Sequence, residues 1–201
     1  GAWLVPGWLY RQASGATPAG SMAFPETGIG IYPGLGGMLR MARHVGPALA
    51  KYFAFTGAFI SAADALALGI VTKLVESAGV DAAIQSLAVA GTPDKYRTRD
   101  IPEKFKAVAA LFGPGSVATI LSGKIPAGAN AELAGKVVKT LGYKAPLALR
   151  IADDIVDQQA PLPMRAAVEI ELGRLQDIFS TADALEGLSS AGRRRPEFKG
   201  A

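Results

Sequence analysis

Residues 24–37 read FPETGIGIYPGLGG, and the interpretation of the whole chain starts from this stretch. It holds one carboxylate, Glu26, among residues that are mainly apolar or glycine. A carboxylate in such surroundings is poorly solvated, which pushes its pKa upward toward neutrality, as a general acid or base requires. The glycines at 28, 30, 34, 36 and 37 let the backbone adopt positive φ and let a ligand approach closely. The alternative interpretation is a glycine-rich turn with one hydrogen-bonded Glu.

Composition limits the classes of function. The chain has 201 residues, half of them hydrophobic, which is enough for one domain with a real core. It has no cysteine and a single histidine, His44, which excludes disulfides, a cysteine nucleophile and a metal site of thiolates or clustered histidines. The net charge of +4 is too small to indicate nucleic-acid binding, but it suits an anionic small ligand such as a nucleotide. No apolar run approaches the roughly 18 residues of a membrane span, so we expect no membrane partner. The composition without cysteine fits a reducing interior, and we expect a cytoplasmic location.

The first half of the chain alternates strand-like and helix-like segments. Glycine and proline punctuate them, and Ser61 is followed by an acid three residues on, which is a helix N-cap signal. We expect strands at residues 22–24 and 70–75, and helices at residues 38–44, 47–55 and 62–68. Residues 91–102 are polar and contain two prolines, which predicts a loop.

The second half is expected to be helical. Ala- and Leu-rich segments with helical spacing end at clear Gly or Pro stops. We expect at least four helices after Ile101 and no sheet from 129 to 191. The candidate helices are residues 102–112, 116–121, 129–141, 146–158, 164–179 and 181–191.

The stretch at 24–37 resembles the signature of the crotonase family, the enoyl-CoA hydratases and isomerases. Further family-like phrases are KAPLALRIA from Lys144 and IFSTADALEGLSSAGRRRPEFKG from Ile178. The resemblance covers roughly residues 16–201 and is weakest at 91–128. That portion looks like an insertion, similar to one in 3-hydroxyisobutyryl-CoA hydrolases and in hydratase halves fused to 3-hydroxyacyl-CoA dehydrogenases.

The resemblance implies an α/β fold, a crotonase-like spiral of ββα turns followed by a C-terminal helical region. It divides the chain into the rear part of the spiral core with the acyl-CoA site loop (1–90), a mostly helical insertion or linker (91–128) and a C-terminal helical region (129–201). The last region would contact coenzyme A and form a homo-oligomer, a trimer or hexamer in the family. Coenzyme A would enter only as part of an acyl-CoA substrate, with no metal or redox cofactor and no nucleic-acid partner.

The same resemblance assigns roles to individual residues. Glu26 matches an acid that exchanges a proton with the α-carbon of the substrate, and we expect it at the end of a short strand. Its pocket would be lined by Pro25, Ile29 and Pro33. Pro25, Pro33 and Gly34 are expected to contact the substrate, and Phe198 and Lys199 the nucleotide of coenzyme A. For Lys199 and for residues 193–195 the alternative is a solvated basic tail.

Position 34 separates the candidate functions. The hydrolases carry Asp there, in the phrase FPDVGG, whereas this chain has Gly34 in YPGLGG, the hydratase form. We therefore expect an enoyl-CoA hydratase or isomerase, whose reaction is the reversible addition of water to a 2-enoyl-CoA. The alternatives are a 3-hydroxyacyl-CoA thioester hydrolase, the hydratase part of a fused dehydrogenase, and a non-catalytic oligomerisation module.

The start of the chain departs from the family pattern. No acid occurs in residues 1–25, and no GGG run precedes Glu26, although relatives carry their second acid and an oxyanion-hole glycine there. Donors aimed at a developing oxyanion are commonly the largest catalytic contribution, about 3 kcal/mol each. We therefore expect a chain that begins within the fold, as a truncation, a frame-shift product or part of a larger enzyme, and that is inactive alone.

Overall fold

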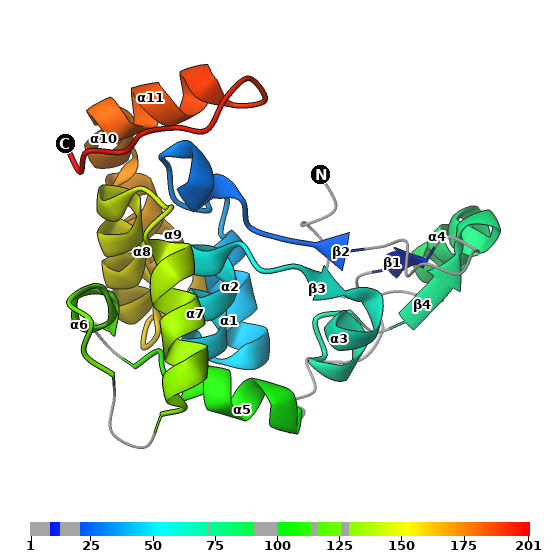
Figure 1. The fold of residues 1–201 in the computed structure, drawn as a ribbon. Helices are drawn as coiled ribbons and strands as arrows, with labels where there is room; N and C mark the ends of the chain where they lie inside the picture. The colour runs from blue at the N-terminus through cyan, green and yellow to red at the C-terminus, as the bar shows by residue number, and fades with distance from the viewer. Residues whose placement is uncertain (1–8, 13–20, 72, 91–99, 114–115, 126–128) are drawn as a thin grey trace. The chain divides into compact units, whose positions relative to one another are not determined.

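The protein is described from a computed structural model, which places residues 9–12, 21–71, 73–90, 100–113, 116–125 and 129–201. Backbone contacts divide it into two compact units. One contains Gly1–Met22 and Phe59–Pro102, and the other contains Ala23–Ala58 and Glu103–Ala201. Figure 1 shows the strands in the first unit and most of the helices in the second. The predicted loop at 91–102 lies largely outside the described residues.

The first unit carries two short sheets. β1 (Leu9–Gln12) pairs in parallel with β4 (Lys73–Glu76), and β2 (Ser21–Met22) pairs antiparallel with β3 (Ile60–Ser61). The helical elements between and after these strands are α3 (Ala62–Ala67), η2 (Ser77–Gly79) and α4 (Val80–Ala90). Ser61 caps α3 as predicted, because its Oγ accepts the N–H of Asp64 at 3.1 Å.

Both strands predicted from apolar runs overlap observed strands, but their bounds differ. The strand expected at 22–24 is only Ser21–Met22, since its partner β3 is itself two residues long. Phe24 is buried without belonging to a strand. The strand expected at 70–75 begins at Lys73 instead, because the N–H groups of Ile70 and Val71 bond back to the carbonyl of Ala65. Helix α4 was not predicted.

The second unit is a helical layer, and it confirms the prediction of at least four helices after Ile101. Among residues 129–191 the structure contains no strand. The expected helix at 164–179 is divided at Arg174. The elements of this unit are η1 (Glu26–Ile29), α1 (Gly37–Val45), α2 (Pro47–Thr56), α5 (Glu103–Ala109), α6 (Ser116–Leu121), α7 (Ala131–Leu141), α8 (Pro146–Gln159), α9 (Met164–Gly173), α10 (Leu175–Phe179) and α11 (Ala182–Ser190). None of the helices in the described residues is long and apolar enough to span a bilayer.

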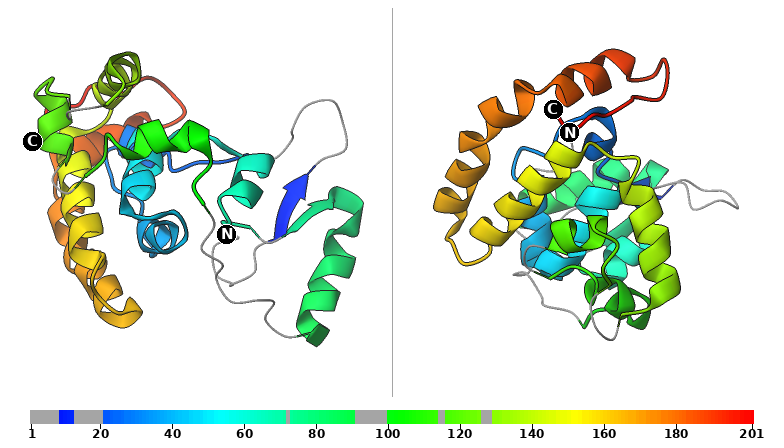
Figure 2. Two further views of the ribbon diagram at one scale, coloured as in Figure 1. Left: turned by 90° about the horizontal axis from the view of Figure 1, so that it is seen from below. Right: turned by 60° about the vertical axis from the view of Figure 1, so that its left-hand side comes forward.

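Helix α8 lies at the centre of this unit. Its buried face contacts α2, α6 and α9, and Figure 2 shows α8 and α9 as neighbouring helices. Leu149 and Ile155 of α8 are fully buried in a cluster with Phe55, Phe112 and Leu141. Burying a side chain of this size contributes about 1.5–3 kcal/mol. The core therefore forms a stable support for the turns packed against it.

An ion cluster is buried beside this core. Lys51 of α2 is fully buried, and its Nζ lies 2.7 Å from Oδ1 of Asp153 and 2.6 Å from Oδ1 of Asp157, both on α8. It also donates to the carbonyl of Gly113 at 3.0 Å, while Oδ2 of Asp153 accepts the N–H of Val117 at 3.1 Å. The cluster joins α2 and α8 to the residues on either side of positions 114–115.

Candidate functional site

Glu26 is the first residue of η1, a single turn of 3-10 helix, and not the end of a strand as predicted. The turn forms because the N–H of Gly28 bonds to the carbonyl of Pro25 at 2.9 Å and Gly30 closes it with φ 85°. The Glu26 side chain is half-buried, and its Oε2 is buried without a hydrogen-bond partner among the described residues. Burial raises the pKa of Glu26, although its own backbone N–H partly offsets this rise.

The Glu26 turn is fixed from two sides by hydrogen bonds. The hydroxyl of Thr27, which is fully buried, donates to the carbonyl of Phe55 at 3.0 Å at the end of α2. The carbonyl of Thr27 accepts the N–H of Ala145 at 3.0 Å, at the start of α8. Glu26 therefore sits on a backbone with little freedom to move.

Helix α11 packs against the turn at a distance that only glycine permits. A Cβ atom at Gly30 would overlap the carbonyl of Asp183, and a Cβ atom at Gly187 would overlap the carbonyl of Ile29. Gly30 also has positive φ, so its side-chain-free backbone is needed for both conformation and contact. The glycine at 30 thus serves helix packing, besides the turn conformation that the sequence suggested.

The loop after the turn is held by Glu171 of α9. Its Oε1 accepts the N–H of Gly36 at 2.8 Å, and its carbonyl accepts the hydroxyl of Tyr32 at 2.7 Å. Leu35 has φ 58°, uncommon for a residue with a side chain, and it is 94% exposed. Its carbonyl accepts a guanidinium N–H of Arg40 at 2.6 Å. A strained, exposed residue held in place by its neighbours is a feature found at functional sites.

Glu171 is itself in an unfavourable environment for a charge. It is 2% exposed, and its Oε2 has no hydrogen-bond partner among the described residues. Burial raises the pKa of Glu171, with partial compensation from the N–H of Gly36, the Gln159 side chain and Arg40. Burial and the Glu171 carboxylate together raise the pKa of Tyr32 to about 12, so this phenol stays protonated as a donor.

Of the other residues predicted to contact the substrate, Pro25 directly precedes the Glu26 turn, and Pro33 and Gly34 lie on the loop after it. Pro25 is exposed, Pro33 is buried, and Gly34 is partly exposed. A Cβ atom at Gly34 would lie 3.8 Å from Oε1 of Glu171, so a carboxylate from α9 approaches the position where the hydrolase phrase has an acid. The pocket predicted around Glu26 stays a prediction.

The C-terminal tail returns along α11 (Figure 1). The carboxylate of Asp183, at the start of α11, accepts the N–H of Lys199 at 2.7 Å and that of Gly200 at 2.9 Å. Phe198 packs partly buried against the core cluster, whereas the Lys199 side chain is exposed. The tail is thus an ordered strap, and it presents Lys199 to solvent.

Two further cations meet at the turn between α7 and α8, Arg195 from the tail and Lys144 from the turn itself. The guanidinium of Arg195 lies over the ring of Tyr143, 3.8 Å from its centroid. The next residue, Lys144, is half-buried, and desolvation by burial lowers its pKa. Lys144 begins the family-like phrase KAPLALRIA, and the resemblance assigns it no function.

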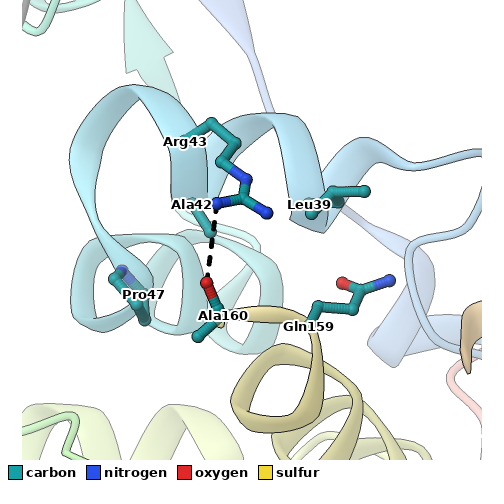
Figure 3. Close-up of a pocket in the computed structure, with 6 residues that line it drawn as sticks. All are labelled: Leu39, Ala42, Arg43, Pro47, Gln159 and Ala160. Atoms are coloured by element: carbon teal, nitrogen blue, oxygen red, sulfur yellow. Dashed lines mark hydrogen bonds between the residues drawn. The ribbon is translucent and has the colours of Figure 1, made fainter. Parts of the chain in front are cut away.

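One small pocket, of about 280 Å³, lies between α1, the start of α2 and the end of α8. Figure 3 shows its lining, with Arg43 donating to the carbonyl of Ala160. None of the predicted site residues lines it, and Leu39, Pro47 and Gln159 complete its wall. In the part of the chain that the structure describes, no cluster of His, Asp or Glu has the arrangement of a metal site.

Sequence reasoning missed Glu171 and Tyr32 as partners of the site loop. Glu171 is 135 residues from Gly36, and nothing in the local pattern of α9 distinguishes it from a solvated helix acid. The usable signal was that buried N–H groups of a glycine-rich loop need an acceptor from elsewhere in the chain.

Known proteins of one family are similar to this chain over most of its length. A family model described as enoyl-CoA hydratase/isomerase matches residues 13–198. The chain is 27% identical over 177 residues to a probable mitochondrial enoyl-CoA hydratase 2 of Arabidopsis thaliana, covering 88% of this chain and 42% of that protein. It is 25% identical over 198 residues to the mitochondrial 3-hydroxyisobutyryl-CoA hydrolase of Danio rerio, covering 90% of this chain and 51% of the relative. The chain thus spans about half the length of these relatives.

Solved structures show the same fold. A carnitinyl-CoA dehydratase from Mycobacterium thermoresistibile superposes with a TM-score of 0.69 at 20% identity, covering 96% of this chain and 56% of that one. An enoyl-CoA hydratase from Rhodobacter sphaeroides gives a TM-score of 0.64 at 24% identity, over 90% of this chain and 55% of the other. The predicted α/β crotonase-like fold with a C-terminal helical region is confirmed. The chain belongs to the enoyl-CoA hydratase/isomerase family.

Proposed function

We propose that this chain carries the acyl-CoA-binding and proton-transfer part of an enoyl-CoA hydratase site. Glu26 would exchange a proton with the substrate's α-carbon during reversible hydration of a 2-enoyl-CoA. The observation that carries this proposal is the buried Oε2 of Glu26, which has no hydrogen-bond partner in the part of the chain that the structure describes, on a turn fixed by Thr27 and Ala145. A carboxyl group with a raised pKa on a rigid support suits general acid–base catalysis, which contributes about 10²- to 10⁴-fold in rate.

The remaining contacts of the proposal come from the loop and the tail. Pro25, Pro33 and Gly34 would border the acyl group and thioester next to Glu26. Phe198 and Lys199 would contact the nucleotide, an aromatic face toward adenine and an ammonium toward phosphate. Coenzyme A enters as part of the substrate, and no metal or redox cofactor takes part.

The thioester hydrolase is the second candidate, because a hydrolase relative aligns over 90% of the chain. Gly34 lacks the acid of the hydrolase phrase. Glu171 is the carboxylate nearest in space that the structure offers in its place, but it is 2% exposed and already bonded to Gly36. A carboxylate buried in this way holds the loop and does not reach a substrate, which favours the hydratase.

Binding and turnover test the proposal separately. The chain should bind butyryl-CoA, measured by isothermal titration, and AMP of equal concentration should not displace it. Hydration of crotonyl-CoA should be absent for the chain alone and should appear when the N-terminal half of a relative is supplied. Glu26→Gln should then abolish hydration, while Glu197→Gln, which changes an exposed acid, should leave it unchanged.

Other outcomes would contradict the proposal. Failure to bind butyryl-CoA, or full hydration activity in the Glu26→Gln variant, would refute it. Release of free thiol from 3-hydroxyisobutyryl-CoA would favour the hydrolase. We also propose a homo-oligomer, a trimer or hexamer in a cytoplasmic setting, which light scattering after size-exclusion chromatography tests. A stable oligomer without any coenzyme A binding would favour the non-catalytic module.

A further inference from the structure

Lys144 lies in the turn between α7 and α8, with its ammonium against the Glu26 turn. A Cβ atom at Gly28 would lie 3.4 Å from its Nζ, and a Cβ atom at Gly57 would lie 3.2 Å from it. Neither glycine has a side chain, so the half-buried ammonium lies against the bare backbone of two segments. A side chain at either position would crowd it.

The ammonium of Lys144 has no partner among the described residues, neither a hydrogen-bond acceptor nor a carboxylate at ion-pair distance. The contrast with Lys51 is direct. That lysine is fully buried, but two carboxylates and the carbonyl of Gly113 compensate its charge. A desolvated charge without compensation lowers stability, which is typical of a group kept for binding.

The position of Lys144 relative to Glu26 limits what it can bind. The N–H of Ala145 bonds to the carbonyl of Thr27, so the backbones of the two turns are in direct contact. Gly28 is two residues from Glu26, a separation that the backbone spans with at most about 7 Å. The ammonium is therefore within reach of a short acyl group whose α-carbon lies at Glu26. The phosphates of coenzyme A are separated from that carbon by the whole pantetheine arm.

We propose that Lys144 is a specificity-determining residue that binds a carboxylate on the acyl group, so that the chain selects carboxylated acyl-CoA thioesters. This inference rests on the proposed function, because it requires an acyl-CoA bound at the Glu26 turn. Arg195, stacked on the neighbouring Tyr143, adds positive potential along the same turn.

Isothermal titration of the chain with three ligands tests this inference. The ligands are glutaryl-CoA, butyryl-CoA and coenzyme A, which carry a carboxylated acyl group, a neutral acyl group and no acyl group. The chain should bind glutaryl-CoA roughly tenfold to a hundredfold more tightly than butyryl-CoA, the range expected for one charge-assisted hydrogen bond. Lys144→Met should remove this preference. Lys139→Met, which removes an exposed charge from α7, should preserve it.

A second variant keeps the test independent of the folding of Lys144→Met. Gly28→Ala retains the lysine but adds a methyl group 3.4 Å from its Nζ, and it should weaken glutaryl-CoA binding more than butyryl-CoA binding. Equal affinities for glutaryl-CoA and butyryl-CoA in the unmodified chain would overturn the inference and leave the proposed function standing. Equal weakening of all three ligands by Lys144→Met would assign the lysine to a phosphate and also overturn it. Absence of binding by any ligand would refute the proposed function and this inference together.

Discussion

The bond between Glu171 and the N–H of Gly36 offers the sharpest test of how the site loop is held. Glu171→Leu removes the acceptor and leaves a buried N–H unsatisfied. Glu171→Gln keeps an acceptor oxygen in place but removes the ionisable group. Because Gly36 is buried and its bond is 2.8 Å long, the two variants separate the role of the hydrogen bond from that of the charge.

The structure sets the size of both effects. An unsatisfied buried donor costs about 1–3 kcal/mol, so Glu171→Leu should lower the free energy of unfolding by that amount. The Glu171 side chain is 2% exposed and its Oε2 is unpartnered among the described residues, so its ionised form is disfavoured. Each unit by which the pKa rises corresponds to about 1.4 kcal/mol. At neutral pH the Glu171→Gln variant should therefore be at least as stable as the unmodified chain.

The contribution of Glu171 to folding stability should depend on pH in one direction. Burial raises the pKa of Glu171 above its ordinary value of 4.5, so the folded state holds this proton more tightly than the unfolded state. Its contribution to stability is fully present below about 4.5, the unfolded-state value, and is lost as pH rises through the folded-state value. Burial also raises the pKa of Glu26 and of Asp153, so the stability that each contributes likewise decreases as pH rises. They remain in the Glu171→Gln variant, so the difference between the two curves isolates Glu171.

Urea unfolding followed by far-ultraviolet circular dichroism, repeated from pH 4 to pH 8, measures these differences. The stability of Glu171→Gln relative to the unmodified chain should increase with pH. Parallel curves would refute the reasoning. So would a Glu171→Gln variant as unstable at pH 7 as Glu171→Leu, because the charge itself would then be needed to hold Gly36.

Three further outcomes are expected. Lys51→Met leaves the Asp153 carboxylate buried without its cation and should lower the free energy of unfolding, measured in urea, by about 3–5 kcal/mol. A decrease of less than about 1 kcal/mol would show that the cluster is well hydrated. In a thermal melt the Lys144→Met variant should unfold at the same temperature as the unmodified chain or higher, because it removes a half-buried charge that has no partner among the described residues. A lower unfolding midpoint would show that Lys144 has a partner in the folded chain. Asp183→Ala removes the acceptor of two tail N–H groups and should speed tryptic cleavage after Lys199. Unchanged cleavage would show that Phe198 alone fixes the tail.

The helices could be predicted because their ends depend on nearby residues. Pro47 occupies the first position of α2, and Ser61 accepts the N–H of Asp64, as their residue types suggested. Helix α6 has the predicted bounds. Caps and stops act within about four residues, so a single sequence contains the information that they use.

The strands depend on partners that sequence does not reveal. Phe24 and Ile70 have the apolar character of buried strands, and both are buried, yet neither belongs to a strand of the described residues. Hydrophobic runs predict burial, while pairing is set by where a second strand lies in space. The same limit applies to Glu26. Its poorly solvated environment was predicted correctly from its neighbours, but its 3-10 turn depends on contacts with α2, α8 and α11.

Buried and half-buried ionisable groups in the second unit differ in how far their charges are compensated. Glu171 is compensated at Oε1 by the N–H of Gly36 but not at Oε2, and it holds the site loop. Lys51 and Asp183 face partners that offset their burial, so their charges stabilise the core and the tail. Glu26 and Lys144 lie on two turns joined by one backbone hydrogen bond, and among the described residues neither Oε2 of Glu26 nor Nζ of Lys144 has a partner. Folding alone gives no reason to keep an acid and a base in this condition. A ligand that takes up a proton at one group and brings negative charge to the other would supply the missing interactions, and a carboxylated acyl thioester has both properties.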